Sequence, residues 1–158
     1  MERELTENPL FRIDYDGQWF HDGAPIRRHE LARLFATKGL RVEPDGTCWL
    51  QSPESRYPVT VEDVPFIIVD YDIENPGPDQ NVTLITNMDE KAMLGPERTL
   101  ALRPEPKGGV AVPYIEIRPG LYARMNRPVY YKLVALAGEV NGKMMLRSGG
   151  VNHILGMT

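Results

Sequence analysis

Residues 11–28 of the chain read FRIDYDGQWFHDGAPIRR, and residues 114–131 read YIEIRPGLYARMNRPVYY. Aligned without a gap at an offset of 103, the two stretches place Gly17 on Gly120 and Pro25 on Pro128. A glycine after Asp or Pro is typical of a hairpin turn, and a proline before an apolar pattern is typical of the first turn of a helix. Each stretch therefore predicts a hairpin followed by a helix.

A second pair of stretches extends the similarity. Residues 43–52 (EPDGTCWLQS) match residues 139–148 (EVNGKMMLRS) at an offset of 96, with Glu, Gly, Leu and Ser identical. Both contain an Asp-Gly or Asn-Gly pair, which favours a two-residue hairpin turn. We attribute most of the change in offset to the helix, which we expect to begin at the proline and to be about one turn shorter in the second copy. The pattern predicts an internal duplication, and the alternative is that turn and cap residues recur by chance.

The region between the copies predicts further strands. Apolar or alternating runs cover 64–72, 82–86, 91–94 and 99–103, with a long hairpin loop at 73–81. We expect an α+β fold made of two related antiparallel β subdomains, each with a helix. The N-terminal repeat subdomain is expected to span residues 1–60. The larger, β-rich C-terminal subdomain is expected to span residues 61–158.

Composition narrows the function classes. The chain has 158 residues, 42% hydrophobic and 25% charged, which is ordinary globular usage. Its net charge of −4 argues against a general nucleic-acid binder, which would show a basic surface. A single cysteine, Cys48, fits a reducing compartment. No apolar run is long enough for a signal peptide or a membrane span, so we expect a cytoplasmic protein.

Several motifs resemble one bacterial family. They are Asp16-Gly17-Gln18-Trp19, Gly23-Ala24-Pro25-Ile26-Arg27-Arg28, the Asp45-Gly46 turn leading to Leu50 and Pro53, Val61-Glu62-Asp63-Val64-Pro65-Phe66, Thr86-Asn87, Arg118-Pro119-Gly120-Leu121-Tyr122-Ala123-Arg124 and Arg127-Pro128-Val129-Tyr130-Tyr131. Together they resemble the domain-of-unknown-function family 1285 over nearly the whole chain. One motif departs from the family pattern, since Pro53-Glu54-Ser55-Arg56 stands where Pro-x-Glu-Lys is expected.

The resemblance carries expectations about fold and function. It implies two domains with an internal duplication, the second superficially similar to pleckstrin-homology folds. It also implies a nucleotide-like ligand at the interface of the two domains and a role in signal transduction. The family supplies no reaction, so this implication indicates a direction and not a mechanism.

Arginines are the first candidate ligand-binding residues. Arginine outnumbers lysine 13 to 5, and a planar guanidinium suits bidentate binding of phosphate or carboxylate. Arg28 and Arg127 stand at predicted helix starts, where the helix dipole also favours an anion, and Arg118 precedes a hairpin turn. The hypothesis is that these three residues bind an anionic ligand, with Arg127 as the principal contact. The alternative is that they are solvated charges or members of ion pairs.

Four further residues complete the predicted site. Glu62, Asp63 and Asn87 are expected to bind the polar groups of the ligand, and Tyr131 to stack on its ring. Glu62 and Asp63 begin an acidic stretch, 62–79, that contains no Lys or Arg. The structural alternative is that these two carboxylates pair with arginines.

The sequence lacks the common motifs for catalysis and for metal binding. The sequence contains no nucleotide-binding glycine-rich loop and no serine-hydrolase elbow. The acidic residues at 70, 72 and 74 lack the glycine and glutamate of a calcium loop, and the three histidines have no metal-ligand spacing. We therefore expect no metal, no cofactor and no catalytic residue.

Three functions follow in order of preference. The first is a non-enzymatic regulatory or ligand-sensing protein that binds a nucleotide-like or other anionic small molecule. The second is an interaction module for a signalling protein, in which a strand edge or groove is the binding surface and the arginines only join the subdomains. The third is a hydrolase of a phosphorylated small molecule, for which no nucleophile can be named.

Overall fold

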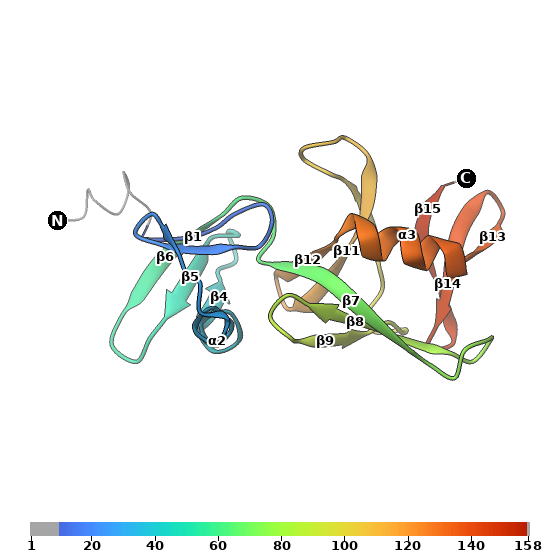
Figure 1. Ribbon diagram of the computed structural model, residues 1–158, viewed down its shortest axis with the longest axis horizontal. Helices are drawn as coiled ribbons and strands as arrows, with labels where there is room; N and C mark the ends of the chain where they lie inside the picture. The colour runs from blue at the N-terminus through green and yellow to red at the C-terminus, as the bar shows by residue number, and fades with distance from the viewer. Residues whose placement is uncertain (1–9, 158) are drawn as a thin grey trace. The chain divides into compact units, whose positions relative to one another are not determined.

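The computed structural model describes residues 10–157, which form two compact units, one ending at Pro65 and the other beginning at Phe66. Both are built mainly of β-strands (Figure 1). Within residues 10–157, no helix has the length and apolar character needed to cross a membrane.

Unit 1 is a six-stranded sheet with one helical segment. The strands are β1 (Phe11–Ile13), β2 (Trp19–His21), β3 (Ala24–Pro25), β4 (Leu40–Val42), β5 (Cys48–Gln51) and β6 (Arg56–Val61), in the order β3-β2-β1-β6-β5-β4. The α-helix α2 (His29–Leu34) continues directly as a π-helix, η1 (Phe35–Gly39). Trp19, Ile13 and Leu40 are the largest fully buried side chains of this unit, and they form its core.

Unit 2 contains a larger sheet, a helix and a small third sheet. The large sheet holds β7 (Phe66–Glu74), β8 (Asn81–Thr86), β9 (Lys91–Met93), β10 (Ala101–Pro104), β11 (Ala111–Arg118) and β12 (Leu121–Met125), in the order β10-β11-β12-β7-β8-β9. The helix is α3 (Arg127–Leu136), and the small sheet joins β13 (Gly138–Val140), β14 (Lys143–Ser148) and β15 (Val151–Met157). Alternating buried residues on β8, such as Val82 and Leu84, give the sheet its core face.

The predicted fold class is confirmed, with one addition. Each large sheet contains one parallel pair of strands, β1 with β6 and β12 with β7, so neither sheet is purely antiparallel. The four strands predicted between the copies are present as β7 to β10, and the loop between β7 and β8 closes a long hairpin.

The internal duplication is present and runs further than predicted. Both copies contain a hairpin, a helix and a second hairpin, and in both a third strand follows: β6 pairs with β5, and β15 pairs with β14. In unit 1, β6 also pairs with β1. In unit 2, β10 occupies the corresponding edge of β11, so β15 contacts β11 without joining its sheet. The extra strand β10 therefore explains why the second copy splits into two sheets.

Two details of the predicted repeat are wrong. Pro25 lies in β3 and does not begin a helix, which starts at His29 instead. The helical segments are also nearly equal, at 29–39 and 127–136. Most of the extra residues of the first copy lie between β2 and α2, where β3 and residues 26–28 precede the helix, whereas a single residue separates β12 from α3. The turns 14–18 and 43–47 are also longer than the two-residue turns of the second copy, whose strands pair further along the hairpin. Side chains of Asp14 and Asp45 accept backbone N–H bonds within these longer turns.

A buried histidine on β15 is expected to make the stability of unit 2 depend on pH. His153 is 2% exposed, its Nε2 lies 3.1 Å from the carbonyl oxygen of Ser148, and its Nδ1 has no partner within the described residues. Burial lowers the pKa of His153, while the Ser148 carbonyl acts in the opposite direction. Because the unfolded chain then binds more protons than the folded one, the free energy of unfolding falls as the pH drops below about 6.5.

Urea denaturation at several pH values tests this expectation. We expect the midpoint of unit 2 to fall between pH 7.5 and 5.5, and this dependence to be weaker in His153→Gln. His29→Gln, at an exposed position, is the matched control and should keep the full dependence. Equal pH dependence in His153→Gln and the wild type would show that His153 does not cause it.

Candidate functional site

Strands β10, β11 and β12 present a polar face to a pocket in unit 2. The strands are antiparallel neighbours, with Tyr114 opposite Ala101 and Tyr122 opposite Glu116. Side chains two residues apart share a face, so Tyr114, Glu116 and Tyr122 project from the same side. The pocket has a volume of about 350 Å³ and is also lined by Arg98, Arg103 and Arg118.

Arg103 stacks on both tyrosine rings. Its guanidinium carbon lies 4.5 Å from the ring centre of Tyr122 and 5.1 Å from that of Tyr114. Arg103 is exposed, and among residues 10–157 its guanidinium meets no carboxylate. The site thus combines a planar cation with aromatic faces, which suits a ligand that has both an anionic group and a flat ring.

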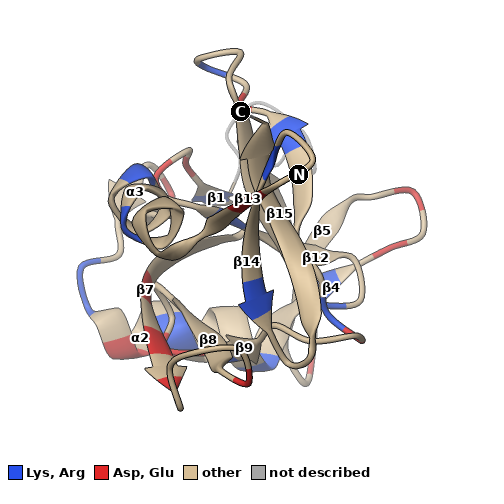
Figure 2. Cartoon of the chain, turned by 90° about the vertical axis from the view of Figure 1, so that its right-hand side faces the viewer, with Lys and Arg blue, Asp and Glu red and all other residues tan. Residues whose placement is uncertain are grey.

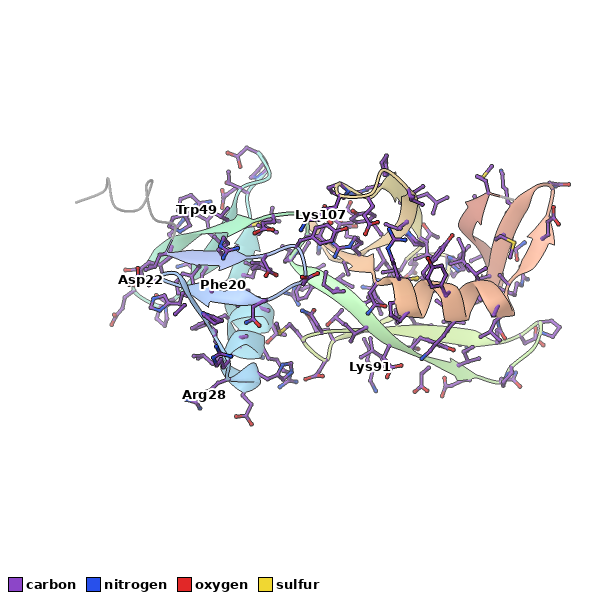
Figure 3. All side chains as sticks on the ribbon, turned by 45° about the horizontal axis from the view of Figure 1, so that its top comes forward. Phe20, Asp22, Arg28, Trp49, Lys91 and Lys107 are labelled. Carbon is purple, nitrogen blue, oxygen red and sulfur yellow. The ribbon has the colours of Figure 1, made fainter. Side chains whose placement is uncertain are left out.

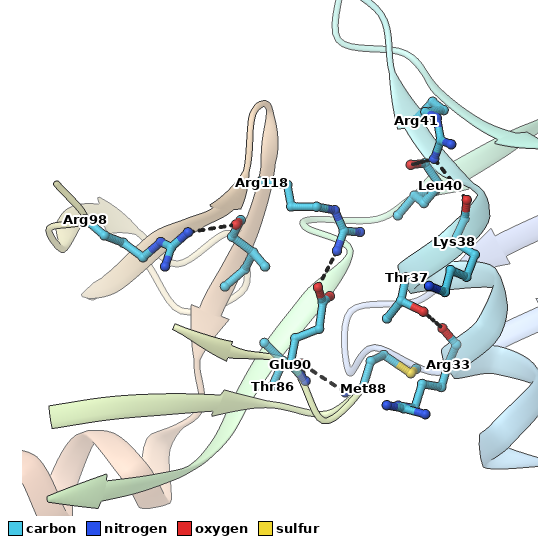
Figure 4. Close-up of polar contacts among 11 residues, drawn as sticks. Arg33, Thr37, Lys38, Leu40, Arg41, Thr86, Met88, Glu90, Arg98 and Arg118 are labelled. Carbon is cyan, nitrogen blue, oxygen red and sulfur yellow. Dashed lines mark hydrogen bonds and ion pairs between the residues drawn. The ribbon is translucent and has the colours of Figure 1, made fainter. Parts of the chain in front are cut away.

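Arg98 fixes the end of β11. Its Nε donates to the carbonyl oxygen of Glu116 at 3.1 Å, and its Nη2 donates to that of Ile117 at 3.2 Å. Figure 4 shows the Arg98 guanidinium directed at a carbonyl oxygen of this strand. These are carbonyl acceptors, so the positive charge of Arg98 is not cancelled by them. The Glu116 carboxylate in turn accepts a hydrogen bond from the Gly120 amide at 2.8 Å, which orders the turn between β11 and β12.

Arg118 differs from the other two arginines of the pocket. Its Nη1 donates to Oε2 of Glu90, and its guanidinium lies 5.4 Å from the ring centre of Phe66 (Figure 4). Glu90 therefore balances the charge of Arg118, while Oε1 of Glu90 is buried without a partner in the described residues. Arg118 belongs to the pocket wall, with less of its charge available to a ligand.

The other predicted site residues of unit 2 lie outside this pocket. Asn87, which follows β8, forms hydrogen bonds with Ile67 at the start of β7. Its side-chain oxygen accepts from the Ile67 backbone amide at 3.1 Å, and its backbone amide donates to the Ile67 carbonyl at 2.8 Å. Tyr131 is exposed on α3, with its ring centre 5.8 Å from that of Tyr130. Basic residues also occur on α3 and β14, so positive charge in unit 2 is not confined to the pocket (Figure 2).

The predicted residues of unit 1 are also accounted for. Glu62 pairs with Arg12 at 2.7 Å and accepts a hydrogen bond from the Tyr15 amide at 3.0 Å. Arg28 is the N-cap of α2 (Figure 3). With Arg27, it lines an open depression of about 330 Å³. Asp63 is half-exposed at the end of the unit. Their role in binding a ligand stays a prediction.

Arg127 pairs with a buried carboxylate. Its Nη2 lies 2.6 Å from Oε1 of Glu105, whose side chain is 10% exposed, and Gly108 packs against both groups. The start of α3 is capped by Asn126, which accepts from the Val129 amide at 3.0 Å. Both groups that were expected to attract an anion here therefore have protein partners.

We expect Arg127→Ala to lower the free energy of unfolding by about 1–3 kcal/mol, because it removes a charged partner from the buried Glu105. The same change in a Glu105→Gln background should cost less, and a double-mutant cycle by urea denaturation measures the difference. Additive effects on stability, together with a loss of anion affinity, would instead make Arg127 a ligand contact.

No metal or reactive cysteine site accompanies the pocket in the described chain. Within residues 10–157, no three His, Cys, Asp or Glu side chains gather as metal ligands. Cys48 is half-buried on β5, and burial raises the pKa of its thiol, which lowers its reactivity at neutral pH.

The sequence motifs predicted only part of the pocket. Arg118 was a candidate, and Tyr122 follows from the turn that places it opposite Glu116. The sequence motifs did not indicate Arg98 and Arg103. Both residues lie before β11 in the chain, and no local sequence signal predicts how their segment pairs with that strand. The alternation of Tyr114, Glu116 and Arg118 along β11 is the pattern that could have indicated a polar face.

These features define a two-unit α+β protein with a duplicated hairpin-helix-hairpin motif and an arginine and tyrosine pocket on its second unit. Residues 4–64 match the family model described as "Domain of unknown function (DUF1285), N-terminal domain", and residues 65–155 match "Protein of unknown function (DUF1285), C-terminal domain". The chain belongs to the DUF1285 family.

Two solved structures are similar to the chain. One is a DUF1285 family protein from Silicibacter pomeroyi DSS-3, with a TM-score of 0.85 and 31% identity, covering 96% of this chain and 81% of the other. The second is a DUF1285 family protein from Shewanella baltica OS155, with a TM-score of 0.62 and 26% identity, covering 82% of this chain and 94% of the other. No curated protein matches the chain.

Proposed function

We propose that the protein is a non-enzymatic, ligand-sensing regulatory protein that binds a nucleotide-like anion in the pocket formed by β10, β11 and β12. The observation that carries this proposal is the position of Arg103, which lies over two tyrosine rings and meets no carboxylate in the described residues. A ligand phosphate would take up the free guanidinium donors, and a planar base would stack on an aromatic or guanidinium face.

The neighbouring residues support binding over catalysis. Glu116 is held by the Gly120 amide and Arg118 by Glu90, so the groups around Arg103 are already ordered. The lining contains Glu and Thr but neither His, Cys, Ser nor Asp. The three arginines of the lining supply the donors to bind a phosphate, and the Glu116 carboxylate, which could otherwise act as a base beside them, is held by the Gly120 amide.

Calorimetric titration of the full chain tests this proposal. The probes are adenosine and guanosine mono- and diphosphates, with the bare nucleosides and inorganic phosphate as controls. We expect the nucleoside phosphates to bind more tightly than either part alone. Arg103→Ala should cost about 1.5–3 kcal/mol, which is at least tenfold in Kd.

The matched control is Arg147→Ala on β14, because Arg147 is an exposed arginine outside the pocket, and its Nη1 donates to the Asn152 side-chain oxygen at 3.4 Å. It should leave affinity unchanged. Absence of binding by every nucleoside phosphate would reject the proposal and favour the second function, an interaction module in which these arginines only order the sheet.

A further inference from the structure

A second pocket lies in unit 1, where the π-helix meets the sheet. It has a volume of about 460 Å³, and its apolar lining comes from Phe11, Leu34, Phe35, Leu50, Pro53 and Tyr57. The ring centre of Phe11 lies 5.6 Å from that of Phe35 and 6.0 Å from that of Tyr57. A volume of this size and a mainly apolar lining with several aromatic rings are typical of small-molecule sites.

The π-helix shapes this pocket. π-Helical segments are rare and occur frequently at functional sites. Here η1 brings Phe35 and Lys38 to the same pocket, and Thr37 donates a hydrogen bond to the Arg33 carbonyl at 2.7 Å (Figure 4). A Cβ at Gly39 would lie 2.6 Å from Cδ1 of Leu50. The end of the π-helix therefore rests directly on β5, and the pocket wall is preformed.

The charge at the unit 1 pocket favours an anionic ligand. Lys38 is the only charged residue that lines the pocket, and among residues 10–157 its ammonium group has no ion-pair partner. The polar side chains at the rim are occupied locally: Gln51 donates to the Ser52 carbonyl at 2.9 Å, and Ser52 donates to the Ser55 carbonyl at 2.9 Å. Leu34 is 52% exposed beside them, so the edge of the pocket is apolar next to Lys38.

From these observations we infer that the unit 1 pocket binds a small amphipathic carboxylate. Its hydrocarbon or aryl body packs among Phe11, Phe35 and Tyr57, and its carboxylate pairs with Lys38. This site lies entirely in unit 1 and is independent of the nucleotide-like site proposed for unit 2.

Decanoate, below its micelle concentration, is the probe that tests this inference. The ring centre of Trp19 lies 6.0 Å from that of Phe35 and 6.5 Å from that of Phe11. Its fluorescence should therefore change when a ligand binds in this pocket. We expect saturable binding of decanoate by the full chain. Lys38→Gln should weaken it by about fivefold, the upper range for an exposed ion pair, and Lys38→Arg should restore it. Lys91→Gln, at an exposed lysine on β9 (Figure 3), should leave affinity unchanged.

Decanol separates the contribution of the apolar body from that of the charge. Lys38→Gln should not change its affinity, whereas Leu34→Ser should weaken both ligands. The inference is overturned if decanoate does not bind saturably, or if Lys38→Gln leaves its affinity unchanged. A dimer in sedimentation that Leu34→Ser dissociates, without decanoate binding, would assign the pocket to a second copy and also overturn it.

Discussion

Replacing Trp19 by alanine is expected to lower the free energy of unfolding of unit 1 by about 3–5 kcal/mol, which is the usual cost of removing a large aromatic side chain from a core. Trp19 is completely buried on β2 and packs its ring against Phe11 and Phe35. These residues join the first hairpin to the helical segment. Alanine would therefore leave a cavity between the hairpin and the helix that holds the unit together.

Guanidinium chloride denaturation, followed by circular dichroism, measures this effect. Trp49→Ala is the matched control, because Trp49 is only half-buried, under Arg56, and its indole N–H donates to the Thr47 hydroxyl. It should cost less than about 1.5 kcal/mol. Trp19→Phe should recover much of the loss, since it keeps a ring and removes a buried indole N–H that has no partner in the described residues. Equal costs for Trp19→Ala and Trp49→Ala would contradict this description of the core.

The second large effect is expected at Gly149, in the turn between β14 and β15. Its φ is +64°, and a Cβ there would lie 2.7 Å from the Leu94 carbonyl oxygen and 2.8 Å from Cα of Gly95. The left-handed conformation costs about 1–2 kcal/mol for a residue with a side chain. The steric overlap with backbone adds about 1–3 kcal/mol. Gly149→Ala should therefore destabilise unit 2 by about 2–5 kcal/mol.

The neighbouring glycine provides an internal control. Gly150 also has a positive φ, +84°, but a Cβ there would meet nothing within 4 Å. Gly150→Ala should thus show only the conformational cost. Urea denaturation of both variants isolates the close approach to Leu94 and Gly95. If the two substitutions cost the same, the turn does not pack as closely as described.

The repeat was predictable because hairpin turns and helix caps are local. Pro119-Gly120 and Asn141-Gly142 form the two-residue turns that their residues favour. The prediction that Pro25 begins a helix was wrong, because the fixed φ and missing N–H of proline also suit an edge strand. Strand β3, which contains Pro25, is the edge of its sheet. Local sequence cannot distinguish these two uses of proline.

The contacts of the candidate site residues were harder to predict than the repeat, because they join residues far apart in the sequence. Arg127 meets Glu105 across 22 residues, and Arg118 meets Glu90 across 28. Neither carboxylate lies in a motif that indicates such a partner. Arg103 could not be predicted as a site residue for a similar reason. Its position over Tyr122 depends on the pairing of β10 with β11, and the sequence before β10 carries no local signal for that pairing.

Arginine-selective NMR tests whether an anionic ligand binds in the pocket of β10, β11 and β12, because the Nε–H resonances report contacts of individual guanidinium groups. In a titration of the full chain with a nucleoside diphosphate, we expect saturable shifts of the Arg103 and Arg98 resonances at a common Kd. The Arg147 resonance should not move. Shifts that spread over all arginines without saturation, or saturable shifts that leave Arg103 and Arg98 unmoved, would contradict a ligand site in this pocket.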